Sequence, residues 1–399
     1  MGSAVPPLYL DACATSPPAP AVLEAMAEVD RNAWANPSSL HGFGLAAADV
    51  LERSRLRLAH LLGCDSEELL FSSGGSESIH LALLGVAASL PAGRLLISAV
   101  EHPATVAAAD QLHRRGWEVC QLPVNALGQV EAAALEPLLA PPTRLVSVIW
   151  GQSEVGTVQD IGTIGALCRA AGVLLHLDAV QVVGHRAIDF SALPVDLLSF
   201  TAHKLQGPRG IGALLVRRGV TIQPLIGGGG QERGRRGGTE PVALAAGMAR
   251  ALELAQERLE AGGGCDPLMQ LRDDLLAALL ALDGVHLSGP DPRRGEPRLP
   301  HHLSLLITDR AGKPLEGRRL VRELWREGIA CSSGSACSAI QTTPAHAPAG
   351  GASPVLLAMG LPPDWAASGL RLSLGPWLKG RELERVPAAL ERARTRMEG

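Results

Sequence analysis

The sequence has 399 residues, of which 46% are hydrophobic and 19% are charged, and its formal net charge is −4. This length predicts two to three domains, and the composition is typical of a globular protein. The small negative charge argues against nucleic-acid partners, and the lack of a Lys/Arg block argues against a membrane-surface partner. No apolar stretch is long enough to span a bilayer, and residues 1–7 lack the pattern of a signal peptide.

The cysteines indicate a reducing environment. Their number is odd, their spacing is irregular and they form no C-x-x-C pair; they stand at positions 13, 64, 120, 168, 265, 331 and 337. No cluster of Cys and His has zinc spacing, so we expect no metal site. We therefore expect a cytoplasmic protein in which most cysteines are buried small hydrophobic residues.

Apolar runs alternate with helical patterns through the first half of the chain. The runs predict strands at 68–72, 94–99, 119–122, 144–150, 173–178, 196–201 and 212–216. Helices are expected between them at 76–90, 105–115, 131–139 and 161–171. This rhythm predicts an α/β fold with a mainly parallel seven-stranded sheet flanked by helices. Ligands of such sheets bind at the carboxyl ends of the strands.

The last part of the chain predicts a smaller α+β domain. A long helix at 241–259 is broken by Gly262-Gly263-Gly264. Beyond it, helices are expected at 269–282, 315–327 and 381–394, and short strands at 285–287, 302–306 and 370–373. We assign residues 16–250 to the large domain and residues 251–399, together with 1–15, to the small one.

Lys204 is one of only three lysines, the others being Lys313 and Lys379. It follows the strand predicted at 196–201, and Asp178 ends the strand predicted at 173–178. Pyridoxal phosphate (PLP) needs such a pair, because a lysine forms a Schiff base with its aldehyde and a carboxylate keeps its pyridine nitrogen protonated. A surface lysine and an Asp that caps a helix are the alternative interpretation.

Two glycine-rich segments suggest anion binding. Ser73-Gly74-Gly75-Ser76 follows a strand and opens a helix, where free N–H groups can hold a phosphate, although a simple N-cap turn is also possible. Residues 227–239 have no hydrophobic period and combine glycines and arginines with Thr239. This second segment is either a flexible linker or a loop that reaches an anionic site across a subunit boundary.

Three further residues suggest chemistry. His102 ends a strand and is either a structural residue or one that stacks on a cofactor or moves protons. Arg371 lies within a strand pattern and needs an anionic partner, either a substrate carboxylate or a structural salt bridge. Cys337 lies among small residues, which favours an exposed thiol that can ionise, whereas Cys331 ends an apolar stretch and is expected to be buried.

Together these segments resemble the cysteine desulfurase family, the class V branch of fold-type I PLP enzymes. The motifs follow the family order over nearly the whole chain, from Tyr9-Leu10-Asp11 to residues 371–375. They include Asn36-Pro37-Ser38-Ser39, Ser73-Gly74-Gly75-Ser76, Glu101-His102, Glu154-Val155-Gly156, Asp178-Ala179-Val180-Gln181, His203-Lys204 and the segments 228–239 and 332–337. The resemblance implies a PLP-dependent homodimer that converts L-cysteine to L-alanine and passes sulfur to an acceptor protein for iron–sulfur cluster or other cofactor synthesis.

The resemblance also implies a role for each matching residue. Lys204 would hold PLP, Asp178 would pair with its pyridinium, His102 would stack on its ring and Gln181 would bind its phenolic oxygen. The phosphate would be bound by Gly75, Ser76, Thr201 and His203, and by Thr239 of the partner subunit. Cys337 would become the persulfide, and the substrate side of the site would contain Arg371 and Asn36.

One segment departs from the family pattern. Gln152 and Ser153 stand where the family usually has two asparagines, the second at a cofactor-binding position. Ser153 is too short to replace an amide there. This departure leaves open a degenerate PLP-fold protein that acts as a binding scaffold in a sulfur-transfer complex. Selenocysteine lyase, or another class V lyase or aminotransferase on the same scaffold, is the alternative enzyme activity.

Overall fold

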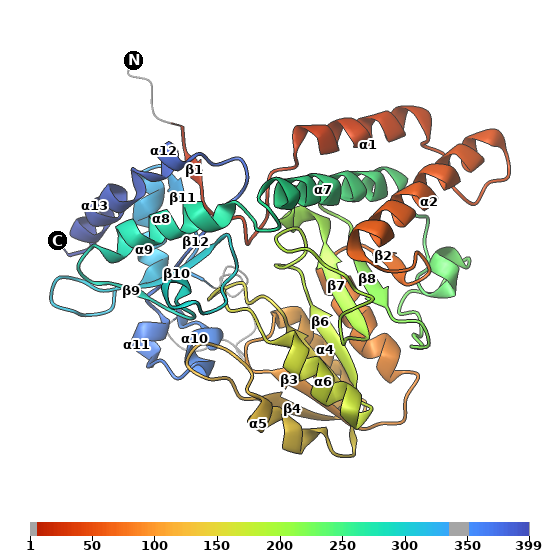
Figure 1. The fold of residues 1–399 in the computed structure, drawn as a ribbon, viewed down its shortest axis with the longest axis horizontal. Coiled ribbons are helices and arrows are strands. Elements are labelled where there is room, and N and C mark those ends of the chain that lie inside the picture. The colour runs from red at the N-terminus through yellow and green to blue at the C-terminus, as the bar shows by residue number, and fades with distance from the viewer. Residues whose placement is uncertain (1–5, 335–350, 399) are drawn as a thin grey trace.

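The structure, a computed structural model, describes residues 6–334 and 351–398. A large sheet covered by helices forms one part of it, and a smaller group of strands and helices forms the other (Figure 1). The described N-terminal segment lies in the smaller part, close to the C-terminal helices.

The large sheet has seven strands in the order β2-β8-β7-β6-β5-β3-β4. They are β2 (Leu69–Ser72), β3 (Arg94–Ser98), β4 (Glu118–Leu122), β5 (Thr143–Ile149), β6 (Leu174–Asp178), β7 (Leu197–Thr201) and β8 (Gly212–Val216). Only β8 pairs antiparallel with its neighbours, so the other six strands share one direction. This confirms the predicted mainly parallel sheet, and it places the carboxyl ends of six strands at one edge.

Helices cover both faces of this sheet and bury an apolar core on each. They are α1 (Pro20–Asn32), α2 (Gly42–Leu62), α3 (Gly75–His80), α4 (Pro103–Arg114), α5 (Ala132–Leu135), α6 (Ile161–Ala171) and α7 (Val242–Ala261). The helix predicted at 76–90 is α3 followed by a π turn at Leu81–Gly85. The helix predicted at 131–139 is α5 followed by a 3₁₀ turn at Glu136–Leu139, where Pro137 cannot donate a helical hydrogen bond.

The smaller part contains a three-stranded antiparallel sheet of β9 (Val285–Leu287), β10 (His302–Ile307) and β12 (Gly369–Ser373). Its helices are α8 (Leu268–Leu280), α9 (Gly317–Arg326), α10 (Pro354–Ala358), α11 (Pro363–Ala366), α12 (Gly380–Leu383) and α13 (Val386–Glu398). The single helix predicted at 381–394 is wrong, because the chain breaks between α12 and α13. Pro387 begins the second helix well and would disrupt the interior of a continuous one.

The N-terminal segment joins this smaller part. Strand β1 (Leu8–Tyr9) pairs in parallel with β11 (Ile329–Ala330), and Leu8 and Leu10 are buried in the leucine-rich core of the C-terminal helices. The segment then crosses toward the large sheet, where Ser16 N donates to His203 O at 2.9 Å. Residues near the start of the chain therefore lie between the two parts. No helix among the described residues is long and apolar enough to cross a membrane.

Candidate active site

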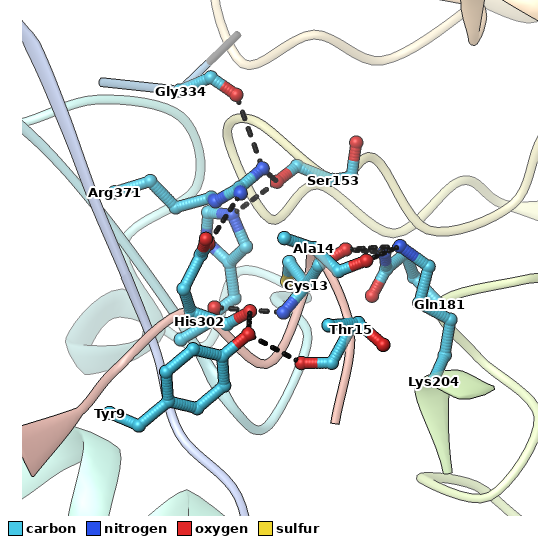
Figure 2. A network of polar contacts seen from close by, with 12 residues as sticks. Tyr9, Cys13, Ala14, Thr15, Ser153, Gln181, Lys204, His302, Gly334 and Arg371 are labelled. Carbon is cyan, nitrogen blue, oxygen red and sulfur yellow. Dashed lines mark hydrogen bonds and ion pairs between the residues drawn. The ribbon is translucent and has the colours of Figure 1, made fainter. Parts of the chain in front are cut away.

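Lys204 lies at the carboxyl edge of the large sheet, at the end of a 3₁₀ turn that follows β7. Its Nζ donates to Cys13 O at 2.5 Å and to Ala14 O at 2.7 Å. Gln181 Nε2 donates to the same Cys13 carbonyl at 3.0 Å. Figure 2 shows Lys204 and Gln181 meeting the N-terminal segment from the side of the large sheet. The structure thus brings these two predicted site residues together.

Asp178 ends β6 and is 2% exposed. Burial raises the pKa of its carboxyl to about 6, although the Val180 N–H and the charge of Lys204 act in the opposite direction. A buried carboxylate of this kind is stabilised by a cationic partner. The protonated pyridine nitrogen of PLP is such a partner, and Lys204 from the neighbouring strand end supplies the amine for its aldehyde. The residues at this edge therefore fit PLP.

His102 and His203 are both held as neutral imidazoles. Burial and the charge of Lys204 lower the pKa of each to about 4. His102 begins α4, and its Nδ1 accepts the Ala104 N–H at 3.1 Å. A neutral, oriented ring is suited to stacking on a cofactor, and a neutral imidazole can also accept a proton. Both predicted roles of His102 therefore stay predictions.

The glycine turn before α3 packs tightly against the strand ends. A Cβ on Gly75 would come within 3.0 Å of Val180 Cγ2, and one on Gly212 of β8 would come within 2.7 Å of the Gly74 backbone. The N–H groups that open a helix have no partner within the helix, so they are available to an anion. Thr201 lies beside this turn, and its hydroxyl donates to Ile211 O at 3.0 Å. Ser76 is exposed at the start of α3.

Arg371 lies on β12 in the smaller part and is 3% exposed. Its Nη2 donates to Asp11 Oδ1 at 2.7 Å, and its Nη1 donates to Ser153 O and to Gly334 O, each at 3.1 Å. Its Nε is buried without a hydrogen-bond partner among the described residues. The guanidinium thus stands next to the Lys204 group with a salt bridge already formed (Figure 2).

The departure at Gln152 and Ser153 has a structural explanation. Gln152 is 2% exposed; its Nε2 donates to Val100 O at 3.1 Å, and its Oε1 accepts the Glu154 and Val155 N–H groups. The side chain therefore closes the turn after β5. At Ser153 the contacts use the backbone carbonyl, which accepts from His302 Nε2 at 2.9 Å as well as from Arg371.

Cys337 lies outside the described residues. The chain reaches the site shortly before it, because Gly334 O is bound by Arg371. Cys331 is described and is half-buried rather than fully buried. Burial of its thiol raises the pKa strongly, which agrees with the prediction that this cysteine stays protonated.

Asn36 and Thr239 make local contacts rather than joining the Lys204 group. Asn36 Oδ1 accepts the Ser38 N–H at 2.9 Å on the exposed connection between α1 and α2. Thr239 is exposed at the end of the glycine–arginine segment. That segment is fixed near α3, because Arg236 Nε donates to Glu77 Oε1 at 2.9 Å. Neither residue is assigned a role by the described chain alone.

The N-terminal segment is the functional feature that the sequence analysis missed. Residues 11–15 supply the Asp11 carboxylate and the carbonyls that Lys204 and Gln181 contact. Cys13 itself is buried, and its Sγ lies 3.4 Å from His301 Nε2. No local sequence pattern identifies a segment whose backbone carbonyls bind other residues, and Cys13 lies 191 residues from Lys204 in the sequence. Only the small side chains of Ala12, Cys13 and Ala14 hint at a close approach.

Comparisons with known proteins agree with this geometry. The family model for aminotransferase class-V matches residues 8–386. A cysteine desulfurase IscS of Dictyoglomus turgidum is 36% identical over 388 residues, which cover 96% of this chain and 94% of that protein. One of Clostridium botulinum is 38% identical over 372 residues, covering 92% and 89%. A solved NifS-like protein superposes with a TM-score of 0.86 at 32% identity, covering 98% of this chain and 99% of that one.

These matches span nearly the whole chain, and they include the strand ends that carry Asp178 and Lys204. The chain therefore belongs to the class-V aminotransferase family of PLP-dependent enzymes, and within it to the cysteine desulfurases.

Proposed function

We propose that this protein converts L-cysteine to L-alanine and leaves the sulfur as a persulfide on Cys337, from which it passes to an acceptor protein. In this reaction the C–S bond of cysteine breaks, an S–S bond to Cys337 forms, and the substrate carbon takes up a proton. The observation that carries the proposal is that Lys204 and Arg371 both bind residues 11–14, with Asp178 close enough to Lys204 to feel its charge, and that Arg371 also binds Gly334, three residues before Cys337. We expect the sulfur to serve iron–sulfur cluster synthesis or another sulfur-containing cofactor, because relatives of this chain are named cysteine desulfurase IscS.

The residues around Lys204 would hold PLP, which supplies an electron sink for the substrate Cα. Lys204 would bind its aldehyde, Asp178 would hold its pyridine nitrogen protonated and the neutral ring of His102 would stack on it. Gln181 would reach the phenolic oxygen. The phosphate would be bound at the turn before α3 and the end of β7 by Gly75, Ser76, Thr201 and His203.

The substrate would enter from the side of the smaller part. Arg371 would hold its carboxylate, with Ser153 and Asn36 nearby, and Lys204 would move the proton at Cα. The Asp11 salt bridge at 2.7 Å keeps the guanidinium oriented before substrate arrives. A guanidinium has five donors, so it can keep the Asp11 contact and still offer N–H groups to a carboxylate.

The active form would be a homodimer in which Thr239 completes the partner's phosphate site. The connection between α1 and α2 and the first turn of α2 support this, since they expose Trp34 (68%), Leu40 (90%), Phe43 (66%) and Leu45 (56%). Such a concentration of large exposed apolar side chains is typical of an interface. Asn36 lies on the same connection, so dimer formation would also bring it to a site.

We further propose that residues 16–250 form the large domain and residues 251–399, with 1–15, the small one. Separate apolar cores and the pairing of β1 with β11 support this division. We place the protein in the cytoplasm. The six cysteines among the described residues are free, as expected in a reducing compartment.

The test is turnover of L-cysteine by the purified protein loaded with PLP, with alanine as the measured product. Cys337→Ala should retain PLP and lose alanine formation, while the matched variant Cys331→Ala keeps most of it. Mass spectrometry after one turnover should find the added sulfur on the peptide that contains Cys337. Sulfur on Cys331, or normal turnover by Cys337→Ala, would refute the assignment. Faster turnover of selenocysteine than of cysteine would instead favour a selenocysteine lyase.

A further inference from the structure

Two contacts decide which way the Gln181 amide points. Its Nε2 donates to Cys13 O at 3.0 Å, and its Oε1 lies 3.4 Å from His301 Nε2. A carbonyl oxygen only accepts, so the atom beside Cys13 O must be the amide nitrogen, and the amide oxygen must face His301. The Gln181 side chain is 5% exposed, so its orientation is set by the protein rather than by bulk water.

The His301 ring is held in a fixed plane. His301 directly precedes β10 and is 1% exposed. Its ring stacks on the ring of His185, with centroids 3.8 Å apart and planes 16° from parallel. His185 is in turn fixed by Asp266, because its Nδ1 lies 2.7 Å from Asp266 Oδ2. The stack therefore sets the direction in which His301 Nε2 points.

The surroundings of His301 place its ring hydrogen on Nε2. Burial lowers the pKa of the ring well below its ordinary value, so the ring is neutral and one nitrogen carries hydrogen. Nδ1 is buried and has no hydrogen-bond partner among the described residues, whereas Nε2 faces Gln181 Oε1 and Cys13 Sγ, each at 3.4 Å. An N–H group buried without an acceptor is rarer in proteins than an acceptor left unpaired. Nε2 is therefore the donor, and its hydrogen is shared between an amide oxygen and a weaker sulfur acceptor.

We infer that His301 is a positioning residue for the cofactor, because its Nε2–H holds the Gln181 amide so that nitrogen, not oxygen, faces the Lys204 group. Gln181 Nε2 and Lys204 Nζ donate to the same Cys13 carbonyl, so the two nitrogens are neighbours (Figure 2). The phenolic oxygen of PLP is next to the aldehyde that Lys204 would bind. The second N–H of Gln181 Nε2 is then available to that oxygen. The inference rests on the proposed role of Gln181, through which His301 acts.

The opposite orientation of the amide would be unfavourable at two places. It would set the Gln181 oxygen against Cys13 O, and it would present the same oxygen to the phenolic oxygen of PLP. Removal of the His301 N–H makes this orientation more populated. A donor at the phenolic oxygen stabilises its anionic form, and so lowers the pH at which the Schiff base with Lys204 loses its proton. An amide oxygen at the same place raises that pH.

The test is the visible absorbance of the full chain loaded with PLP, titrated with pH in the absence of substrate. His301→Leu should raise the midpoint of the titration by at least about 0.5 pH unit and weaken PLP binding at least about threefold in equilibrium dialysis. His301→Gln keeps an N–H donor on a side chain of similar reach, so its midpoint should stay within about 0.2 unit of the wild type. The exposed His113→Leu on α4 is the matched control and should follow the wild type. The other titratable groups at this edge, Asp178, His102 and His203, are the same in every variant.

The comparison of the two His301 variants separates a hydrogen bond from mere packing. A structural role would make His301→Leu and His301→Gln shift the midpoint alike, and that result would overturn the inference. An unchanged midpoint in His301→Leu would overturn it as well.

Two further substitutions identify the acceptor. In a Gln181→Ala background, His301→Leu should cause no additional shift, because both residues act through one contact. Cys13→Ala removes only the sulfur that shares the His301 N–H, and it should shift the midpoint by less than half as much as His301→Leu does. If the Gln181 and His301 substitutions add fully, or if Cys13→Ala reproduces the whole shift, His301 does not act through Gln181 and the inference is wrong.

Nitrogen NMR of the cofactor-free protein provides a readout that needs neither PLP nor cysteine. With isotope-labelled histidine, the His301 signals are assigned by their loss in His301→Leu, and they should show hydrogen on Nε2. Hydrogen on Nδ1 would contradict the inference. The absorbance titration also needs no turnover. If the wild type binds PLP and forms no alanine, the proposed function fails while both measurements still decide on His301.

Discussion

Replacement of Glu101 by Gln tests whether a neutral acid is built into the cofactor site. Glu101 is 8% exposed, and its Oε1 accepts Ser98 Oγ–H at 2.5 Å and Ile149 N–H at 2.7 Å. Ile149 lies opposite Asp178 in the register of β5 and β6, so the two acids are close. A glutamine carbonyl can accept both hydrogen bonds. Glu101→Gln therefore removes the ionisable group and changes the shape of the site little.

The magnitude follows from the pKa of Glu101. Burial and the nearby charge of Asp178 raise it from 4.5 to about 8, against the hydrogen bonds from Ser98 and Ile149. Below pH 4.5 both the native and the unfolded chain hold the proton, so the group has no effect on stability. Between pH 4.5 and 8 only the native chain keeps it, so the stability of the wild type falls as the pH rises. The full loss is on the order of 5 kcal/mol.

The assay is thermal unfolding of the cofactor-free protein at pH 5 and at pH 8. For a protein domain of this size, 1 kcal/mol of unfolding free energy shifts the melting temperature by about 2 °C. At pH 8, Glu101→Gln should therefore melt roughly 5 to 10 °C above the wild type. At pH 5 the two proteins should differ by only about 1 °C. The exposed Glu136→Gln on the turn after α5 should follow the wild type at both values. If the difference in melting temperature between Glu101→Gln and the wild type is the same at pH 5 and at pH 8, Glu101 is ionised in the native protein and the reasoning is refuted.

Three further substitutions test other contacts. Glu232→Gln should destabilise the protein by about 3 to 5 kcal/mol in urea unfolding, because it leaves buried Arg55 without the carboxylate that binds it at 2.7 and 2.9 Å; a loss below about 1 kcal/mol would contradict this. Gly212→Ala should weaken PLP retention in equilibrium dialysis, since its Cβ would press on the Gly74 backbone, and unchanged retention would disprove that contact. Arg371→Lys should raise the KM for cysteine about tenfold or more, with a smaller effect on kcat, and an unchanged KM would exclude Arg371 from carboxylate binding.

The sequence predicted those parts of the site that lie at strand ends. Asp178 ends β6 and Lys204 follows β7; apart from Leu174 at the start of β6, both strands are buried, and such strands appear as largely apolar runs. Once the order of strands and helices is known, residues at their carboxyl ends must lie at one edge of the sheet. The predicted positions of Gly75 and His102 follow from the same argument, because each opens a helix directly after a strand or its short connection.

The parts that could not be predicted depend on contacts between distant segments. Asp11 binds Arg371 across 360 residues, and no local pattern shows this pairing. The alternatives for Arg371, a substrate carboxylate or a structural salt bridge, looked exclusive from the sequence. In the structure the salt bridge exists and still leaves donors of the guanidinium for a ligand. Likewise, the raised pKa of Glu101 results from burial beside Asp178, which a sequence does not report.

At the two positions that depart from the family pattern, Gln152 and Ser153, backbone contacts explain which effects of the substitutions to expect. Gln152 is used for its amide, which joins the Val100 carbonyl to the N–H groups of Glu154 and Val155 and so shapes the turn after β5. The shape of this turn places the Ser153 carbonyl where it accepts hydrogen bonds from His302 and Arg371. A carbonyl is present whatever the side chain, so a serine at 153 leaves this link between the two parts of the protein intact. The departure therefore bears on what the side chain at 153 can offer a cofactor or substrate, and it leaves the position of Arg371 unchanged.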